Sequence, residues 1–361
     1  ARELGFEVDR TYTKEDLFNE IVITLFYLNN QKLVEVYARD ASDRIKELVG
    51  WGMKIHHYDP PSMVWATGED MVDALLSGLA DKDVETVDDV MITQLLTNGG
   101  KIVGALGANL FSGNLVGFRA KAVVLATGGW GQAYSFTSGT EDLTGDGQAM
   151  AYRAGAELVD MEMVTFNPSV QIWPPGPARG SMFVYRVAWL GSRLLNKHGE
   201  EFMLNYPREI ADMALRTEWH KLMWSVAQAI EVSEGRGSPH GGIYKSVSHL
   251  PWNLVENTLD WRSKGWRFKG GDMSGVAEIL KGRDAIEVGP TAHYFEGGIK
   301  IDETGRTNVL GLYAAGECTG GLFGANRVAA ATTEVIVHGA VAGRSAANYA
   351  LEHADTPNID I

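Results

Sequence analysis

Residues 290–328 read PTAHYFEGGIKIDETGRTNVLGLYAAGECTGGLFGANRV, and this stretch contains the pattern that decides the fold. Its apolar run ends at Gly316 and Glu317, which is typical of a buried parallel strand whose C-terminal end meets a ligand. His293 lies before this run, and a glycine-rich loop with Asn326 and Arg327 follows it. The glycines leave room for a large flat ligand, and a carboxylate can accept hydrogen bonds from ligand hydroxyls. His293 and Arg327 would then offer two donor groups to one face of that ligand.

The composition is that of an ordinary globular protein with room for two domains: 361 residues, 45% hydrophobic and 22% charged. The formal net charge of −14 argues against a nucleic-acid surface. The single cysteine, Cys318, excludes intrachain disulfides and any CxxC metal or iron–sulfur site in this chain. His220, His240 and His249 have no metal-ligand spacing to carboxylates, so we expect no metal site. No apolar run reaches membrane-spanning length, and no signal peptide is visible.

The chain opens at Ala1, and no apolar strand followed by G-x-G-x-x-G occurs anywhere in it. A two-dinucleotide-type fold normally begins with that unit, because the unit supplies the pyrophosphate-binding turn. We therefore expect the chain to be part of a longer protein, or to join pieces of one, with its N-terminal strand–turn–helix missing.

The first third of the chain has helical and then β patterns. Residues 14–54 have the spacing of a helix, with a Gly-Trp-Gly stop at 50–52, and a second capped helix is expected after Thr67. Three β segments at 84–96, 101–109 and 115–119 predict a meander. The meander leads into KAVVLATGG, a strand that ends in a Thr-Gly-Gly turn typical of dinucleotide-binding folds.

A second glycine-rich turn, Thr144 to Gly147, comes directly before a helix of small residues. Its backbone amides can face a cofactor, and Asp146 is expected to cap the helix. From 167 to 288, tryptophans, prolines and glycine-rich breaks alternate with helical segments, which predicts a mobile cap over a ligand. A final helix of small residues is expected from 326 to 350, with its N-terminus near the cofactor.

These motifs, in the order ATGG, TGDG, A..AGA, MEM..F.P, HY..GGI, AAGE and GANR, resemble the flavoprotein subunits of the succinate dehydrogenase and fumarate reductase family. The resemblance implies FAD as the cofactor. It also implies an α/β fold in which an FAD-binding Rossmann-like domain of the two-dinucleotide type, with a β-meander, is interrupted by an α+β capping domain. The FAD-binding domain would comprise residues 1–166 and 290–361, and the capping domain residues 167–289.

The resemblance also implies site residues. His293 and Arg327 match the residues that hold the substrate carboxylate, and Arg216 matches the arginine that passes protons. A free guanidinium titrates far above neutrality, so Arg216 would need Asp212 or Glu218 as a relay partner; the alternative is an exposed ion pair with Asp212. The residues implied for the cofactor are Thr127, Gly128, Gly129, Thr144, Gly145, Asp146, Gly147, Gly316, Glu317, Asn326, Arg327, Ala330, Thr332 and Thr333. Those implied for the substrate are Asn167, Ser169, Tyr185, His293 and Arg327.

Three departures from the family pattern concern the substrate. The family has His-Pro-Thr where this chain has Asn-Pro-Ser at 167–169, and Thr-Glu where it has Val-Tyr at 184–185. The Arg-Gly-Glu-Gly-Gly that follows in the family is Ala-Trp-Leu-Gly-Ser at 188–192. The residues implied for one substrate carboxylate, His293 and Arg327, are retained, but the charged and hydroxyl partners of the second carboxylate are not. An unpaired second carboxylate in a closed site would cost several kcal/mol. We therefore expect a carboxylate substrate whose far end is less charged or bulkier than that of succinate.

The expected activity is that of an FAD-dependent oxidoreductase acting on a CH–CH or C=C bond next to a carboxylate, with hydride exchanged at flavin N5. An iron–sulfur or other electron-transfer subunit is the expected partner, and the expected location is the cytoplasm, either free or attached to a membrane through partner subunits. Two alternatives remain open. One is an L-aspartate-oxidase-like or ketosteroid-dehydrogenase-like flavoenzyme, and the other is a non-catalytic flavin electron-transfer or scaffold subunit. The sequence leaves open whether the flavin is covalently attached.

Overall fold

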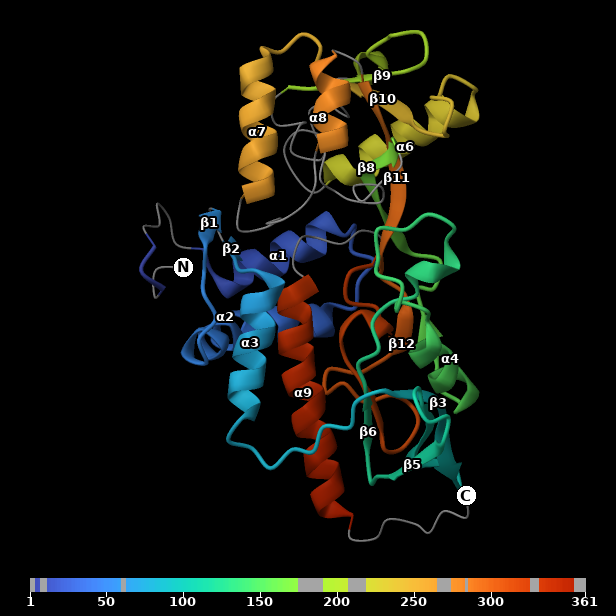
Figure 1. The fold of residues 1–361 in the computed structure, drawn as a ribbon. Helices are drawn as coiled ribbons and strands as arrows, with labels where there is room; N and C mark the ends of the chain where they lie inside the picture. Colours follow the sequence, from blue (N-terminus) through green and yellow to red (C-terminus); the bar gives the residue numbers. More distant parts are fainter. Residues whose placement is uncertain are drawn as a thin grey trace. The chain divides into compact units, whose positions relative to one another are not determined.

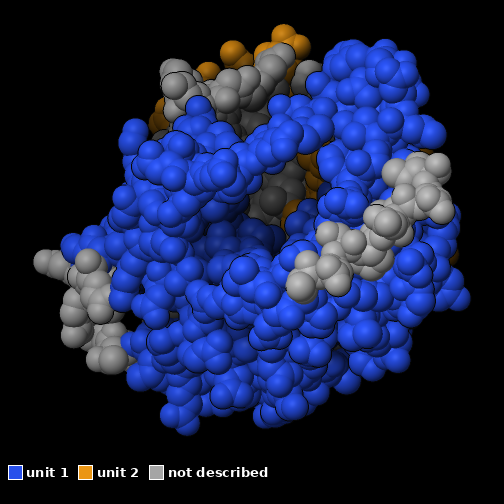
Figure 2. Space-filling model, turned by 90° about the horizontal axis from the view of Figure 1, so that it is seen from below, with its two compact units in different colours: residues 1–130, 143–164, 295–361 blue, residues 131–142, 165–294 orange. Residues whose placement is uncertain are grey.

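The computed structural model describes residues 4–6, 12–59, 63–174, 191–206, 219–264, 274–282, 285–324 and 331–353. The chain forms two compact units (Figures 1 and 2). Unit 1 comprises residues 1–130, 143–164 and 295–361, and unit 2 comprises residues 131–142 and 165–294. Figure 2 shows a hollow in the surface of unit 1.

Unit 1 contains five of the described α-helices and most of the described short strands. Its elements are α1 (Lys14–Thr24), α2 (Gln31–Gly50), β1 (His57–Asp59), β2 (Met63–Trp65), α3 (Gly68–Leu79), β3 (Val90–Asn98), β4 (Lys101–Asn109), β5 (Leu115–Arg119), β6 (Val123–Leu125), α4 (Asp146–Arg153), β7 (Leu158–Val159), β12 (Gly298–Lys300), β13 (Leu312–Ala314), η5 (Gly316–Cys318), β14 (Thr319–Gly320) and α9 (Ala331–Glu352).

Unit 2 is built around one four-stranded sheet. Its elements are η2 (Gly131–Ala133), β8 (Val164–Trp173), β9 (Arg193–Leu195), η4 (Phe202–Asn205), α6 (Trp219–Ser233), β10 (Ile243–Ser246), α7 (Trp252–Lys264), α8 (Ser274–Lys281) and β11 (Ala285–Phe295).

The predicted meander forms as the antiparallel sheet β3-β4-β5. The second and third strands have the predicted bounds, but β3 begins at Val90 instead of residue 84. Residues 81–89 are exposed, with Val84 and Val87 at 58% and 48%. A strand there would have no surface to bury its apolar side chains against, so the early start of the predicted strand was wrong.

The predicted helix over 14–54 is two helices, because the chain turns between α1 and α2. Phe26 and Tyr27 both have positive φ, at 58° and 61°, a conformation that bulky residues rarely adopt and that ends a right-handed helix. Asn30 then starts α2: its side chain accepts a hydrogen bond from the backbone of Lys32, and its own backbone N–H donates to Gly321 at 2.7 Å. Helical spacing continues across such a turn, so the spacing alone could not reveal it.

The sheet of unit 2 has the order β8-β11-β10-β9, with β10 antiparallel to both of its neighbours. The core of the unit is apolar and joins this sheet to the unit's helices. Its buried members are Leu194, Phe202, Ala227, Ile243, Val247, Val255, Leu259, Val276, Leu280, Ile286 and Val288. Ile286 and Val288 of β11 belong to this core, and burial of apolar side chains stabilises the fold around the strand.

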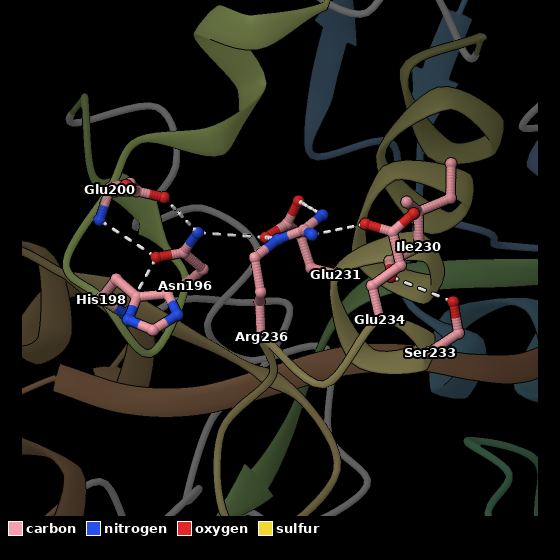
Figure 3. Close-up of polar contacts among 8 residues, drawn as sticks. All are labelled: Asn196, His198, Glu200, Ile230, Glu231, Ser233, Glu234 and Arg236. Atoms are coloured by element: carbon pink, nitrogen blue, oxygen red, sulfur yellow. Dashed lines mark hydrogen bonds and ion pairs between the residues drawn. The ribbon is translucent and has the colours of Figure 1, made fainter.

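A charge network around the buried Glu231 links the end of α6 to the turn after β9 (Figure 3). Glu231, which is 4% exposed, accepts hydrogen bonds from Nε and Nη2 of Arg236, both at 2.8 Å. Asn196 donates from Nδ2 to Glu231 at 3.1 Å and to Glu200 at 2.9 Å, and Arg236 also pairs with Glu234. The hydrogen bonds from Arg236 lower the pKa of Glu231, and those to the two carboxylates raise the pKa of Arg236. A bidentate pair of this kind gives a defined geometry to the segment that joins helix and strand.

Candidate functional site

Two glycine-containing turns meet at one edge of unit 1 because two strands run side by side. β6 and β13 pair in parallel, with Leu312 opposite Val123 and Ala314 opposite Leu125. The carboxyl ends of parallel strands lie at the same edge of a sheet. The turn at 127–129 therefore lies beside the turn at 316–317.

The Glu317 side chain lies at this edge, where it accepts a backbone hydrogen bond and where Gly129 leaves room for it. The N–H of Phe295 donates to Glu317 Oε1 at 3.2 Å. A Cβ atom on Gly129 would lie 2.6 Å from the same oxygen, which is closer than non-bonded atoms approach. Gly316 has a φ of 79°, which favours glycine. The glycines at 129 and 316 thus allow the carboxylate of Glu317 to occupy this place.

The turn before α4 packs against the same group. A Cβ atom on Gly147 would lie 1.8 Å from Thr127 Oγ1, and Gly145, with a φ of 79°, lies against Trp130. Gln148 donates from Nε2 to the carbonyl oxygen of Gly128 at 3.0 Å. Residues 127–129, 145–147 and 316–317 therefore form one cluster, which we name the glycine cradle.

Asp146 does not cap α4 with its side chain, contrary to the prediction. The cap position is taken by Gly145, which makes no side-chain cap bond, and Asp146 is the first helical residue. Thr144 Oγ1 donates to the Asp146 carboxylate at 2.6 Å, and both side chains are exposed. The carboxylate still lies at the positive end of the helix dipole, where an acid is favourable.

Two other glycines in the predicted ligand-facing stretch serve packing instead. A Cβ atom on Gly297 would lie 2.1 Å from the carbonyl oxygen of Asp160, and one on Gly298 would lie 2.3 Å from that of Cys318. These positions need glycine because backbone lies against backbone at β12.

One buried polar atom beside the cradle lacks a partner. Gln148 is 3% exposed, and its Oε1 atom has no hydrogen-bond partner among the residues that the structure describes. Buried polar groups are nearly always paired, so an unused acceptor beside glycine backbone fits a ligand that brings its own donors. FAD carries hydroxyl and ring N–H donors, so these residues fit the expected cofactor. The sequence analysis missed Gln148, although a polar residue directly after a TGDG turn was a usable signal.

Cys318 lies directly after Glu317 but is not poised to react. Its sulfur lies 3.3 Å from the carbonyl oxygens of Leu125 and Ala315, either of which can accept the single thiol hydrogen. Burial raises the pKa of the Cys318 thiol to about 11, so it stays protonated at neutral pH.

Two further cofactor residues of the prediction lie at the start of α9. Thr332 is exposed and Thr333 is half-buried, in the first described turn of the helix. Asn326, Arg327 and Ala330 lie outside the described residues.

His293, the predicted carboxylate ligand, lies on β11 in unit 2. Its Nδ1 atom is 2.8 Å from Oγ of Ser138, a contact that the sequence analysis did not foresee. Asn167, predicted at the substrate, is buried in β8 of the same unit. The Ser169 side chain, Tyr185 and Arg216 lie outside the described part of the chain, and their roles stay predictions.

Another histidine of unit 2 has a carboxylate partner. His240 Nδ1 lies 2.7 Å from Oε1 of Glu287, and the imidazole stacks on Trp173 with 4.1 Å between the ring centroids. Across the described ranges, no three His, Cys, Asp or Glu side chains gather as metal ligands would. In the same ranges, no helix is long and apolar enough to cross a bilayer.

Similarity to known proteins extends over almost the whole chain. Residues 8–333 match the family model described as FAD binding domain. The chain is 37% identical to a fumarate reductase (CoM/CoB) subunit of Methanothermobacter marburgensis over 345 residues, which covers 90% of this chain and 60% of that protein. It is 35% identical to the L-aspartate oxidase of Streptomyces coelicolor over 298 residues, covering 80% of this chain and 47% of the oxidase.

Among solved structures, the Sdh1 protein of Mycobacterium smegmatis in complex with UQ1 superposes with a TM-score of 0.78 at 28% identity. This likeness covers 97% of the present chain and 61% of Sdh1. It confirms the predicted α/β FAD-binding fold with a capping domain. The chain thus spans about half to three-fifths of the length of these relatives. It belongs to the FAD-binding family that includes the flavoprotein subunits of fumarate reductase and succinate dehydrogenase, and its cofactor is FAD.

Proposed function

We propose that this chain is the flavoprotein part of an oxidoreductase that interconverts a carbon–carbon single bond and a double bond next to a carboxylate. When bound, FAD supplies hydride exchange between its N5 atom and one of the two carbons. The observation that carries the proposal is the glycine cradle around Glu317, in a chain that is 37% identical to a fumarate reductase (CoM/CoB) subunit. In this proposal Glu317 accepts hydrogen bonds from hydroxyls of the cofactor.

The substrate carboxylate would be held by two donors. His293 offers an imidazole from strand β11, and Arg327 offers a guanidinium that can bind a carboxylate through two hydrogen bonds. Together they would stabilise the negative charge that develops on the carboxylate as hydride adds to the neighbouring double bond. Arg216 would deliver or remove the proton at the adjacent carbon, with an acidic relay partner.

The far end of the substrate would meet a less charged surface. Asn167, which is 2% exposed, stands where the family has histidine, so it can hydrogen-bond but adds no positive charge. Val184, Tyr185 and Trp189 replace charged and hydroxyl partners in the sequence. The proposed substrate class is therefore an enoate, or its saturated acid, with one carboxylate and an uncharged or bulky far end.

A turnover screen tests this assignment. The full-length holoprotein is reduced anaerobically and mixed with fumarate or with crotonate, and the oxidised enzyme is given succinate or butyrate. We expect the monocarboxylic pair to react faster, and a matched His293→Gln variant to lose most of this rate. Faster reaction of fumarate or succinate would contradict the substrate class. No reaction with any of the four acids would contradict the assignment to CH–CH bonds.

A second candidate is an oxidase like the L-aspartate oxidase to which the chain is 35% identical. An oxygen electrode separates the two candidates, since rapid oxygen consumption by the holoprotein with L-aspartate favours the oxidase.

The proposed electron partner is an iron–sulfur or other electron-transfer subunit. The only cysteine, Cys318, is buried with a raised pKa, so this chain offers no set of thiolates for a cluster. The proposed location is the cytoplasm, either free or at a membrane through partner subunits. Isolation of the native protein from membrane and cytosolic fractions, with iron analysis of the complex, tests both proposals.

A further inference from the structure

We propose that Ser138 is a positioning residue that sets the tautomer and the orientation of His293 for binding a substrate carboxylate. The inference rests on the proposed function, because it gives His293 the role of a carboxylate donor. The contact that carries it is the 2.8 Å distance between Ser138 Oγ and His293 Nδ1, within unit 2.

The loop that carries Ser138 is fastened to the strand that carries His293. The backbone N–H of Ser138 donates to the carbonyl oxygen of Ala292 at 3.0 Å. Thr137 forms a parallel β-bridge with Ala292, and its hydroxyl donates to the same carbonyl oxygen at 2.9 Å. The backbone position of Ser138 is thus fixed relative to the residue directly before His293.

A third bond closes the turn. The N–H of Gly139 donates to Thr137 Oγ1 at 3.0 Å, so this hydroxyl is used as donor and as acceptor. Thr137 therefore fastens the loop, and the hydroxyl of Ser138 is the group directed at the imidazole. A hydrogen bond to one ring nitrogen sets which nitrogen carries the proton and how the ring is turned.

The serine hydroxyl can serve both protonation states of His293. When the imidazole is neutral, the hydroxyl donates to Nδ1, which leaves the proton on Nε2. When both nitrogens are protonated, Nδ1–H donates to the serine oxygen, and the hydroxyl can turn to the Ala292 carbonyl oxygen at 3.5 Å. In both states Nε2, the nitrogen that Ser138 does not contact, bears a hydrogen for the carboxylate.

Without the hydroxyl, the neutral ring could place its proton on Nδ1. Nε2 would then present a lone pair to a negatively charged oxygen, which is repulsive. We expect the KM for the carboxylate substrate to rise roughly 10-fold, the size of one neutral hydrogen bond, with a smaller change in kcat.

The test uses an isosteric pair of variants in the full-length holoprotein. Ser138→Val and Ser138→Thr have the same branched shape, but only the threonine keeps the hydroxyl. Ser135→Ala, an exposed serine of the same segment, is the matched control. The readouts are KM and kcat for crotonate and fumarate, and long-range ¹⁵N spectra of histidine-labelled protein, which report the tautomer without turnover.

We expect Ser138→Val to raise KM and to move one histidine away from the Nε2–H tautomer, while Ser138→Thr and Ser135→Ala behave as the wild type. Equal effects of valine and threonine, or no change in the histidine signals with valine, would overturn the inference. A His293→Gln variant with wild-type KM would overturn the proposed function instead, and the histidine spectra would still report on the Ser138 contact.

Discussion

Replacing Gly129 with alanine should weaken FAD binding, because the added methyl group displaces the carboxylate of Glu317. The new Cβ would lie 2.6 Å from Glu317 Oε1 and 2.7 Å from its carboxyl carbon. Non-bonded heavy atoms attract at about 3.5–4.0 Å, so the carboxylate must move by roughly 1 Å. Gly129 does not have a positive φ, so alanine adds no backbone strain and the effect belongs to Glu317.

The magnitude follows from the bond that this movement breaks. Glu317 would lose the hydrogen bond from the buried N–H of Phe295, and leaving such a group unpaired costs about 1–3 kcal/mol. With the carboxylate displaced, bound FAD would also lose its hydrogen bond to Glu317. Hydrogen bonds to charged groups contribute about 1.5–3 kcal/mol, so the dissociation constant for FAD should rise roughly 10- to 150-fold. Titration of the apoprotein with FAD, followed by flavin fluorescence, measures the change.

The matched control is Gly339→Ala in α9. A Cβ atom there meets nothing within 4 Å, and alanine favours a helix by about 1 kcal/mol over glycine, so FAD binding should be unchanged. Equal FAD affinities for the two variants would refute the role of Gly129 and Glu317 in the cradle.

Three further predictions concern buried polar groups. Gln148→Leu should weaken FAD binding about 10-fold, because it removes the acceptor at Oε1. It should also lower the stability of the apoprotein by about 1 kcal/mol, because it removes the hydrogen bond from Nε2 to the Gly128 carbonyl oxygen. An unchanged FAD titration would speak against the role of Oε1. Glu231→Gln should make stability less dependent on pH in the acid range. Hydrogen bonds from Arg236 lower the pKa of Glu231 in the folded protein. The wild type therefore has this stabilisation above the ordinary glutamate pKa of about 4.3 and loses it as the pH falls through the lowered pKa. Urea unfolding of both proteins across this range checks it, and parallel curves would contradict it. His338→Leu should flatten the pH dependence of stability between about pH 4 and 6.5. Burial lowers the pKa of His338 to about 4, so in this window the unfolded chain binds a proton that the folded chain does not. Wild-type stability therefore rises with pH there, by at most about 1.4 kcal/mol per pH unit. The same unfolding series measures how the stability of each protein changes with pH. The slopes of the two curves should differ below about pH 6.5 and become equal above about pH 7.

Much of the cradle could be predicted from the sequence because its residues follow strands. Thr127, Gly128 and Gly129 end one apolar run, Gly316 and Glu317 end another, and parallel pairing of such runs brings their ends together. The meander followed from turn residues and alternating patterns, with two of its three strands at the predicted bounds. Turn residues, alternating patterns and the rule that parallel strands end at the same sheet edge are sufficient to predict these features.

Other features depend on contacts between distant residues. The turn at Phe26 and Tyr27 has no glycine or proline to announce it, and Asn30 gains its backbone partner from Gly321, almost three hundred residues away. The contact of Ser138 with His293 likewise follows from a β-bridge between a loop and a strand far along the chain. Periodicity and capping rules describe neighbours in sequence, so they could not reveal either contact.

The central claim is that FAD lies in the glycine cradle with its hydroxyls on Glu317. A crystal structure of the full-length holoprotein tests this most directly. We predict a cofactor hydroxyl within hydrogen-bonding distance of the Glu317 carboxylate, about 2.5–3.0 Å, and a cofactor donor at Gln148 Oε1. FAD bound with neither Glu317 nor the 127–129 turn in contact with it would contradict the account.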